Sequence, residues 1–458
     1  MRQILITGDR SGSGKTSITL ALAALLAQSY RVQTFKVGMD YIDPSYLSAV
    51  SGRPCRNLDS FTHSDAQIRD IFEYGCRGAD MALVEGVRGL YEGAEALNDT
   101  GSTAAIAKKL DLPVILVVSA QSITRSSAAI VKGFQAFDPD IRIAGVILNN
   151  TRGGSHRAKA TTAIEHYCGV PVIGAIPRME EMQLAMRHLG LVPYREGTGR
   201  GDFDTRIATI TKMIRQYVDL DRFVSLMKES DMPLERSPAF DPSPARDVKI
   251  GIALDEAFNF YYADLFDILH ALGADYVPFS PVHDRLPEAD GYIIGGGYPE
   301  LFVRELEAND RMREALRETS QNGIPVYAEC GGLMYLTERI MLKKGWQGSA
   351  ADQSYDMCGL FTGETRMPAR RVVSYVEGTS DTGSPLGKAS FRGHEFHYSD
   401  VVLDRDTRFA YRLSRGVGIR DNYDGAVVSN TQGSYTHLHP VASMGMLRHF
   451  VGLCQTRY

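Results

Sequence analysis

The feature that most restricts the fold of this chain is the glycine-rich segment Gly8–Thr16. An apolar run, Gln3–Thr7, ends just before it, and a helical pattern, Thr16–Ala27, follows it. A phosphate-binding loop requires this context, because glycines let backbone N–H groups face an anion and a helix N-terminus favours negative charge. The sequence therefore predicts a nucleotide-binding α/β fold at this end of the chain.

Each residue in the second half of this loop has an expected role. The backbone N–H groups of Gly12, Ser13 and Gly14 should face the phosphates. We expect Lys15 to contact the β- and γ-phosphates and Thr16 to offer its hydroxyl to Mg²⁺. The first glycine is one residue farther from Gly14 than in the standard pattern, a spacing that resembles dethiobiotin synthetase and the MinD-type ATPases.

Apolar runs and helical patterns alternate through residues 1–234, the first predicted domain. The later runs are Val32–Val37, Met81–Val84, Val114–Val118, Ala144–Leu148 and Val172–Ile176. Continuous apolar strands separated by helices indicate a parallel sheet that is covered on both faces. The first domain is therefore predicted to be a P-loop domain with a parallel sheet.

Polar residues follow several of these strands. Glu85 ends one strand, and Asp59 and Asp40 follow two other apolar runs. Ligands and magnesium bind at the carboxyl edge of a parallel sheet, so we expect Asp59 and Glu85, with Thr16, to hold Mg²⁺. For each acid alone, a helix cap or a surface position is an equal alternative. Asn149 closes another strand and is predicted to read the adenine edge, with a role in the turn as an equal alternative.

A linker and a second α/β domain are predicted after the first. Residues 235–247 contain three prolines and no apolar period, which is typical of a linker. Residues 248–458 then begin another strand–helix alternation, with strand Val248–Leu254 and a single long helix over Leu301–Thr319. After residue 355 the pattern changes to short strands and turns.

Cys330 lies between an apolar strand, Ile324–Tyr327, and a helical run, Leu333–Leu336. The small residues Ala328 and Gly332 relieve the strain of a sharp strand-to-helix turn. N–H groups at the helix start can lower the pKa of the thiol and hold an oxyanion. This pattern predicts a nucleophile elbow with cysteine as the nucleophile; a buried structural thiol is the alternative.

A catalytic cysteine needs a base and oxyanion donors. His437 is the preferred base and His439 the alternative. Gly331 and Gly297 are the expected oxyanion donors, the second from the glycine run that ends the preceding strand. His394 and His397 form another cluster, but one short segment without a third ligand is weak evidence for a metal site.

Composition limits the partners and the compartment. The formal net charge of −5 gives no support for nucleic acid or an anionic membrane as a partner. Six cysteines include no C-x-x-C pair, so a disulfide framework is not expected. No apolar run is long enough to cross a membrane. The expected location is the cytoplasm.

Several motifs along the whole chain resemble one family. They are Met39-Asp40-Tyr41-Ile42-Asp43-Pro44, Asn57-Leu58-Asp59, Val84-Glu85-Gly86-Val87-Arg88-Gly89-Leu90-Tyr91-Glu92-Gly93, Gly296-Gly297-Tyr298-Pro299-Glu300-Leu301, Ala328-Glu329-Cys330-Gly331-Gly332 and Gly393-His394-Glu395-Phe396-His397. In this order they resemble the cobyrinic acid a,c-diamide synthases. The resemblance implies a dethiobiotin-synthetase-like ATPase domain joined to a class I glutamine amidotransferase domain. It implies amidation of the a and c acetates of a tetrapyrrole polycarboxylate with ATP, Mg²⁺ and L-glutamine, and no redox cofactor.

The chain departs from the usual pattern of that family at a few positions. Arg88 and Glu92 stand where methionine and aspartate are usual, which resembles the methanogen branch that also amidates nickel-sirohydrochlorin. Class I amidotransferases usually have His-x-Glu, whereas His439 occupies the third position here, and the cobyrinic acid a,c-diamide synthases are similar in lacking that glutamate. The acceptor is expected to contact six residues, namely Asp40, Tyr41, Arg88, Tyr91, His394 and His397.

The resemblance also implies a mechanism. ATP phosphorylates the acceptor carboxylate, Cys330 releases ammonia from glutamine through a thioester, and ammonia displaces phosphate. Two other functions remain open: a cobyric acid synthase that amidates other side chains, and a MinD-like regulatory ATPase. The second leaves Cys330 and His437 without a purpose. A homodimer is compatible with the resemblance, and the macrocycle, its metal and the order of amidation stay open.

Overall fold

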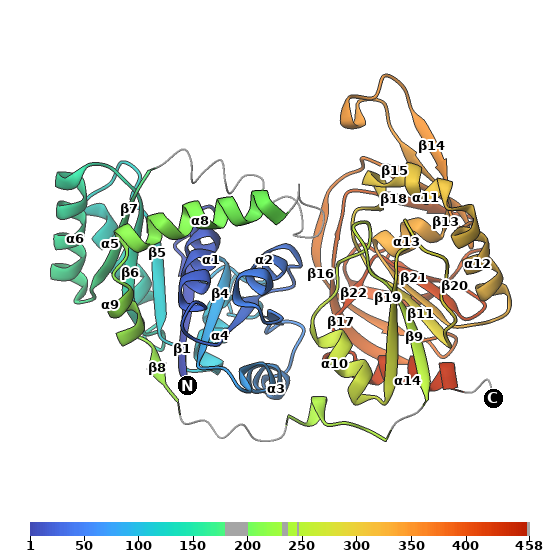
Figure 1. Cartoon of the computed structure of the whole chain (residues 1–458), viewed down its shortest axis with the longest axis horizontal. Helices are drawn as coiled ribbons and strands as arrows, with labels where there is room; N and C mark the ends of the chain where they lie inside the picture. The colour runs from blue at the N-terminus through green and yellow to red at the C-terminus, as the bar shows by residue number, and fades with distance from the viewer. Residues whose placement is uncertain (179–199, 231–236, 245–246, 456–458) are drawn as a thin grey trace. The chain divides into compact units, whose positions relative to one another are not determined.

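The computed structural model describes residues 1–178, 200–230, 237–244 and 247–455. The chain divides into two compact units, Met1–Ser237 and Pro238–Tyr458 (Figure 1). Each unit is described by itself below. No helix among the described residues is long and apolar enough to cross a membrane.

The first unit contains a mainly parallel sheet with the strand order β3-β2-β4-β1-β5-β6-β7. Its strands are β1 (Arg2–Gly8), β2 (Val32–Val37), β3 (Arg56–Leu58), β4 (Met81–Gly89), β5 (Val114–Ser119), β6 (Ile143–Thr151) and β7 (Val172–Pro177), and β8 (Lys228–Glu229) pairs antiparallel with β1. Its described helices are α1 (Lys15–Leu26), α2 (Ile42–Ser51), α3 (Asp65–Cys76), α4 (Thr103–Lys109), α5 (Ser126–Phe137), α6 (Gly154–Cys168), α8 (Arg200–Tyr217) and α9 (Leu220–Ser225).

Helices cover both faces of this sheet, as the continuous apolar strands predict. Ile4 and Ile6 of β1 pack in one apolar cluster with Ile18 of α1 and Ile214 of α8. Leu5, which points to the opposite face of the same strand, is also fully buried. β1 lies between β4 and β5, so the chain reverses direction across the sheet at the loop that follows β1. Ligands of open α/β sheets bind at such a point.

The second unit has a sheet with the strand order β10-β9-β11-β12-β21-β20-β19-β16-β17-β22. The parallel strands are β9 (Val248–Ala253), β10 (Ala274–Phe279), β11 (Gly291–Ile294), β12 (Val326–Glu329) and β21 (Thr431–Ser434). The antiparallel part is β20 (Tyr423–Val428), β19 (Arg408–Arg415), β16 (Val372–Ser380), β17 (Ala389–His397) and β22 (His437–Leu438). A smaller sheet holds β14 (Gln353–Asp356), β13 (Thr337–Leu342), β15 (Phe361–Met367) and β18 (Asp400–Leu403).

The α-helices of the second unit are α10 (Asp264–Ala271), α11 (Val303–Ala308), α12 (Asp310–Gln321), α13 (Gly331–Leu336) and α14 (Met444–Gln455), with 3-10 turns η1 (Pro238–Phe240), η2 (Pro299–Leu301) and η3 (Trp346–Gly348). The single helix predicted over Leu301–Thr319 is wrong, because the chain breaks at Asn309. The side chain of Asn309 accepts a hydrogen bond from Met312 N and starts α12 as its N-cap.

Part of the predicted linker is packed structure. Pro238–Phe240 forms a 3-10 turn whose Phe240 is buried, and Ser243 N donates to the carbonyl of Ala271, 2.7 Å away. The remaining predicted linker residues include 235–236 and 245–246, which lie outside the described residues. The packed part belongs to the second unit, whose boundary falls between Ser237 and Pro238.

Candidate active sites

The loop after β1 has the backbone that its glycines predict. Gly12 and Gly14 have φ angles of 77° and 94°, in the left-handed region that favours glycine. A Cβ on Gly14 would lie 2.2 Å from Nδ2 of Asn149, and one on Gly8 would lie 2.1 Å from Oγ of Ser13. The loop therefore needs glycine at these places for its shape.

Asn149 supports this loop from the end of β6. Its Nδ2 donates to the carbonyl of Ser13 at 2.8 Å, and its Oδ1 accepts from Asn150 N at 2.9 Å. Both ends of the amide are thus engaged by backbone. The structure supports the role in the turn and gives no support to contact with the adenine edge.

A buried charge cluster lies beside the loop. The hydroxyl of Thr16 donates to Oε1 of Glu85 at 2.6 Å, and Lys15 Nζ lies 3.7 Å from the same oxygen. Lys36 Nζ, on β2, donates to Oδ2 of Asp43 at 2.5 Å and to Oε1 of Glu85 at 2.8 Å. Lys36 is 1% exposed, so its charge depends on these two carboxylates.

The pKa directions follow from this packing. Burial alone would lower the pKa of Lys36, but Asp43 and Glu85 raise it above its ordinary value. Burial lowers the pKa of Lys15, and the neighbouring Lys36 lowers it further. Burial and the charge of Asp43 raise the pKa of Asp40 to about 7. Lys36 is therefore a fixed cation in the cluster.

The oxygen atoms at this place fit Mg²⁺. Oε2 of Glu85 is buried and accepts no hydrogen bond within the described part of the chain, and the Thr16 hydroxyl lies beside the other oxygen. Carboxylate and hydroxyl oxygens are ligands that Mg²⁺ takes together with phosphate and water. The described residues hold no group of three or more His, Cys, Asp or Glu arranged for a metal, so phosphate and water oxygens would complete the shell.

Asp59 has a structural role in the turn where it lies. Its Oδ1 accepts hydrogen bonds from Phe61 N at 2.8 Å and Thr62 N at 2.9 Å, so it caps the turn that follows β3. Asp43 is instead the second carboxylate within 3.4 Å of the Thr16 hydroxyl. Asp43 is therefore a further carboxylate beside the metal position, and the expected contact of Asp59 with Mg²⁺ stays a prediction.

The expected acceptor loops show one exposed cation. Arg88 is exposed and has a φ of 52° at the end of β4. Tyr91 donates its hydroxyl to the carbonyl of Phe134 at 2.7 Å, so that hydroxyl is already used. Asp40 Oδ1 accepts from Ile42 N at 2.9 Å, and Tyr41 is the N-cap residue of α2. Arg88 is the most available of these groups for an anionic acceptor, and all four roles stay predictions.

Replacing Lys36 should strongly destabilise the first unit. Lys36→Met leaves Asp43 and Glu85 facing each other without their cation, and breaking a buried pair in this way costs about 3–5 kcal/mol. Lys228→Met is the control, because the Lys228–Asp111 pair is exposed and worth at most about 1 kcal/mol. Urea unfolding of both full-length variants without nucleotide measures the difference. Equal losses in the two variants would contradict the argument.

The structure confirms the sharp strand-to-helix turn predicted at Cys330. β12 ends at Glu329, α13 begins at Gly331, and Cys330 between them has φ 47° and ψ −99°. A non-glycine residue held in this region is strained and typical of functional sites. A Cβ on Gly332 would lie 2.2 Å from the carbonyl oxygen of Ile294, so the turn requires glycine there.

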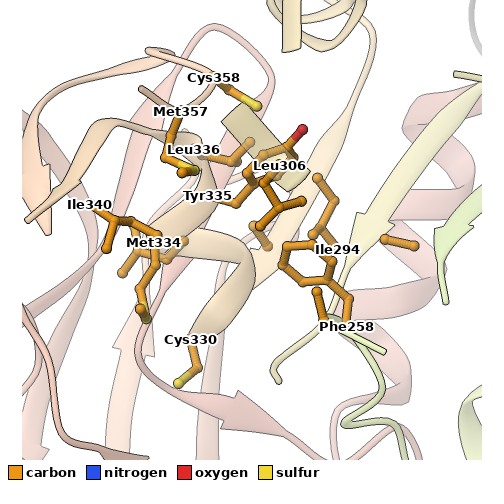
Figure 2. Packing of buried hydrophobic residues seen from close by; sticks show 14 of the residues in the cluster. Phe258, Ile294, Leu306, Cys330, Met334, Tyr335, Leu336, Ile340, Met357 and Cys358 are labelled. Atoms are coloured by element: carbon orange, nitrogen blue, oxygen red, sulfur yellow. The ribbon is translucent and has the colours of Figure 1, made fainter. Parts of the chain in front are cut away.

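The thiol lies at the margin of the apolar core. Figure 2 shows its sulfur directed away from the cluster around Leu336 and Ile340. Cys330 is buried, and its Sγ lies 3.6 Å from the carbonyl oxygen of Phe396. Burial, with the nearby carboxylates of Glu300 and Glu329, raises the pKa of the thiol. The Gly331 N–H at the helix start lowers this pKa, as expected, but burial and the carboxylates outweigh it.

The two candidate bases occupy different surroundings. His437 Nδ1 lies 3.3 Å from Oε2 of Glu329, the residue directly before the thiol. His439 Nε2 lies 3.4 Å from Oδ2 of Asp264, and its Nδ1 accepts from Val441 N at 3.3 Å. His437 lies beside the carboxylate that directly precedes the thiol, whereas His439 lies beside Asp264 of α10, which favours His437 as the base.

His394 and His397 are buried in the second unit, at 9% and 6% exposure. The ring of His394 stacks on His437 with centroids 4.9 Å apart, and His397 stacks on Tyr435 at 3.7 Å. Burial and the neighbouring His437 and His439 hold the pKa of His394 well below its usual value. Both rings are thus engaged by other rings of this unit, and their expected contact with the acceptor stays a prediction.

The glycine run after β11 closes one side of the thiol. Gly297 has φ 154°, and a Cβ there would lie 2.0 Å from the carbonyl oxygen of Ala257. Its N lies 3.0 Å from the position of a Cβ on Gly331, and it donates no hydrogen bond to another described residue. A Cβ on Gly296 would lie 2.7 Å from Cε1 of His437. The glycine run is therefore packed against both the elbow and the base.

The CobQ/CobB/MinD/ParA nucleotide binding domain family matches residues 4–192, and the CobB/CobQ-like glutamine amidotransferase domain family matches residues 249–443. A protein named cobyrinate a,c-diamide synthase in Methanosarcina barkeri is 52% identical, over 96% of this chain and 93% of its own. The chain belongs to the cobyrinate a,c-diamide synthase family. Members with that name in Methanothermobacter thermautotrophicus and Listeria monocytogenes are 42% and 39% identical, over 95% and 99% of this chain and 96% and 99% of their own.

Two residues beside the sites of this cobyrinate a,c-diamide synthase family member were not predicted from the sequence. Lys36 interrupts an apolar strand, and a charge at such a position signals buried partners. Glu329 ends an apolar strand directly before the elbow, which is the same signal. The sequence alone does not identify the partner of either residue, because each partner lies far away along the chain.

Proposed function

We propose that this protein uses ATP and glutamine to amidate the a and c acetate carboxylates of a tetrapyrrole polycarboxylate. The observation that carries the proposal is the presence in one chain of a phosphate loop with Lys15 and Glu85 and an elbow with Cys330 beside the Glu329–His437 pair. The names of the relatives supply the acceptor class.

The first unit would activate the acceptor. An acceptor carboxylate oxygen attacks the γ-phosphorus of ATP, and the bond from that phosphorus to the β-phosphate oxygen breaks. ADP departs, and the acceptor becomes an acyl phosphate. Lys15 would stabilise the charge on the transferring group, with Lys36 holding Glu85 in place. Thr16 and Glu85 would hold Mg²⁺, which supplies charge neutralisation on the phosphates.

The second unit would supply ammonia. His437 takes the proton of Cys330, the sulfur attacks the side-chain amide carbon of glutamine, and the N–H groups of Gly297 and Gly331 face the oxyanion. The proton then goes to the leaving ammonia, and water hydrolyses the γ-glutamyl thioester. Ammonia attacks the acyl phosphate and phosphate leaves, which forms the amide.

Two macrocycles are the candidate acceptors: cobyrinate and nickel-sirohydrochlorin. Arg88 is the group we assign to a spectator carboxylate of either, because it is an exposed arginine on a loop at the end of β4. Mass analysis of products from each macrocycle with ATP, Mg²⁺ and glutamine tests the assignment. If active ATPase–glutaminase protein modifies neither macrocycle, the proposed acceptor class is wrong.

A monoamide should appear early and then be consumed, because one phosphate site must serve two acetates in turn. Time-resolved mass analysis of the macrocycle free in solution measures the monoamide. A diamide that forms with no free monoamide at any time would show that the acceptor is not released between the two steps.

Arg88→Ala should raise the KM for the macrocycle and leave glutamine hydrolysis largely unchanged.

The two alternatives predict other products. A cobyric acid synthase would amidate other side chains, so fragment masses that place the new amides outside the a and c arms would favour it. A MinD-like regulatory ATPase would hydrolyse no glutamine, and the strained elbow at Cys330 argues against it.

A further inference from the structure

The residue before the nucleophile holds the imidazole beside it. Oε2 of Glu329 lies 3.3 Å from Nδ1 of His437, and the two side chains are 11% and 1% exposed. The other carboxylate oxygen accepts from Leu438 N at 2.9 Å and from the hydroxyl of Tyr327 at 2.5 Å. Two donors therefore fix one oxygen of the carboxylate, and the other oxygen faces the imidazole.

The strand pairing explains why these distant residues meet. Glu329 at the end of β12 pairs with Ser434 of β21, and the chain reaches His437 three residues later. His437 is held in turn by pairing with His394 of β17. The position two residues after the base is His439, an imidazole without a carboxylate, which lies against Asp264.

We propose that Glu329 positions His437 for proton transfer in the glutaminase half-reaction, in place of a carboxylate two residues after the base. This inference rests on the proposed glutaminase role of Cys330 and His437. It adds a positioning residue, since Glu329 acts through the imidazole and not on the substrate.

The chemistry needs one tautomer of His437. A proton on Nδ1 shared with the carboxylate leaves Nε2 with the lone pair that accepts the proton of Cys330. The carboxylate then stabilises the imidazolium until the proton passes to the leaving ammonia. Three other ionisable groups lie near this pair. Burial lowers the pKa of His394 and raises that of Tyr327. Burial also raises the pKa of Glu300, beside the thiol, to about 7.

Glu329→Gln tests this role with little change in shape. The amide oxygen still accepts from Leu438 N, but the amide nitrogen donates to Nδ1 of His437 and moves the imidazole proton to Nε2. Glutamine hydrolysis should fall by roughly 100-fold or more. Amidation from free ammonia should stay unchanged, because it bypasses the thiol. Glu329→Asp should recover part of the loss.

A second readout separates positioning from structure. The rate of Cys330 alkylation by iodoacetamide, followed across pH, reports how readily the thiol loses its proton. The Glu329 carboxylate raises the thiol pKa directly but also stabilises the imidazolium that accompanies the thiolate. Glu329→Gln should therefore shift the profile to higher pH, because the loss of the imidazolium's partner outweighs the loss of the direct repulsion. Glu338→Gln is the matched control, because its carboxylate also accepts a backbone N–H, from Gly363 at 3.0 Å, but on β13. It should leave both readouts unchanged.

Three results would overturn the inference. They are glutamine hydrolysis within about threefold of normal in a folded Glu329→Gln protein, an unchanged alkylation profile, and equal loss of the glutamine and ammonia reactions. If Glu329→Gln does not fold, the same readouts on Glu329→Asp decide: normal hydrolysis and alkylation would count against the inference. Glutaminase measured without a macrocycle separates a failure here from a wrong acceptor.

Discussion

Cys330→Ala abolishes amidation from glutamine, and amidation from a high concentration of free ammonia persists; this is the expected result with the largest effect. The thiol is the only group that the proposed mechanism uses to form the γ-glutamyl thioester, so no slower route replaces it. In the proposed mechanism, residues of the other unit, Met1–Ser237, activate the acceptor, and the substitution does not touch that unit. Parallel assays with the two nitrogen donors measure the split.

A second buried cysteine provides the control for this experiment. Cys358 is fully buried in the same unit, so Cys358→Ala removes a comparable thiol outside the elbow. It should leave the ratio of glutamine to ammonia activity unchanged, whatever it does to stability. If Cys330→Ala still uses glutamine, Cys330 is not the nucleophile. If both donors fail equally, the two half-reactions are not separable as proposed.

Lys15→Ala should fail with both nitrogen donors, because each needs the activated carboxylate. Removing a preorganised charge from the transferring phosphoryl group costs roughly 10²–10³-fold in rate. Hydrolysis of glutamine should continue, because the thiol site lies in the other unit. ADP formation and amide formation, measured together with glutamate release, show which half has been lost.

The control for Lys15 is a lysine of the same unit that takes no part in the cluster. Lys212 is exposed on α8, and Lys212→Ala should leave all three rates unchanged. Normal ADP formation in Lys15→Ala would remove Lys15 from the phosphate site. Loss of glutamate release alone would mean that Lys15 acts in glutamine hydrolysis and not in activation of the acceptor.

Local signals explain why much of the fold could be predicted from the sequence. The phosphate loop and the elbow each consist of small residues within a few positions of a reactive one, and the backbone angles at Gly14 and Cys330 agree with that pattern. The parallel sheet of the first unit follows from apolar runs that need cover on both faces. These features depend on near neighbours, which the sequence displays directly.

The rest depended on pairing between distant strands. The orientation of His437 by Glu329 requires β12, β21 and β22 to be placed, and no local pattern contains that information. The burial of His394 beside His437 also follows from pairing with β22, which no local pattern predicts. The pKa of Cys330 could not be predicted either, because burial by distant segments of the chain raises it by more than the helix start lowers it.

The most direct test of the account follows the nitrogen from glutamine into the macrocycle. Purified protein is incubated anaerobically with cobyrinate or nickel-sirohydrochlorin, ATP, Mg²⁺ and glutamine labelled with nitrogen-15 in its side-chain amide. The account predicts a diamide that carries nitrogen-15 in both new amides, placed by fragmentation on the a and c arms, with one ADP formed for each. Amides on other arms, or no labelled amide from protein that hydrolyses both ATP and glutamine, would contradict it.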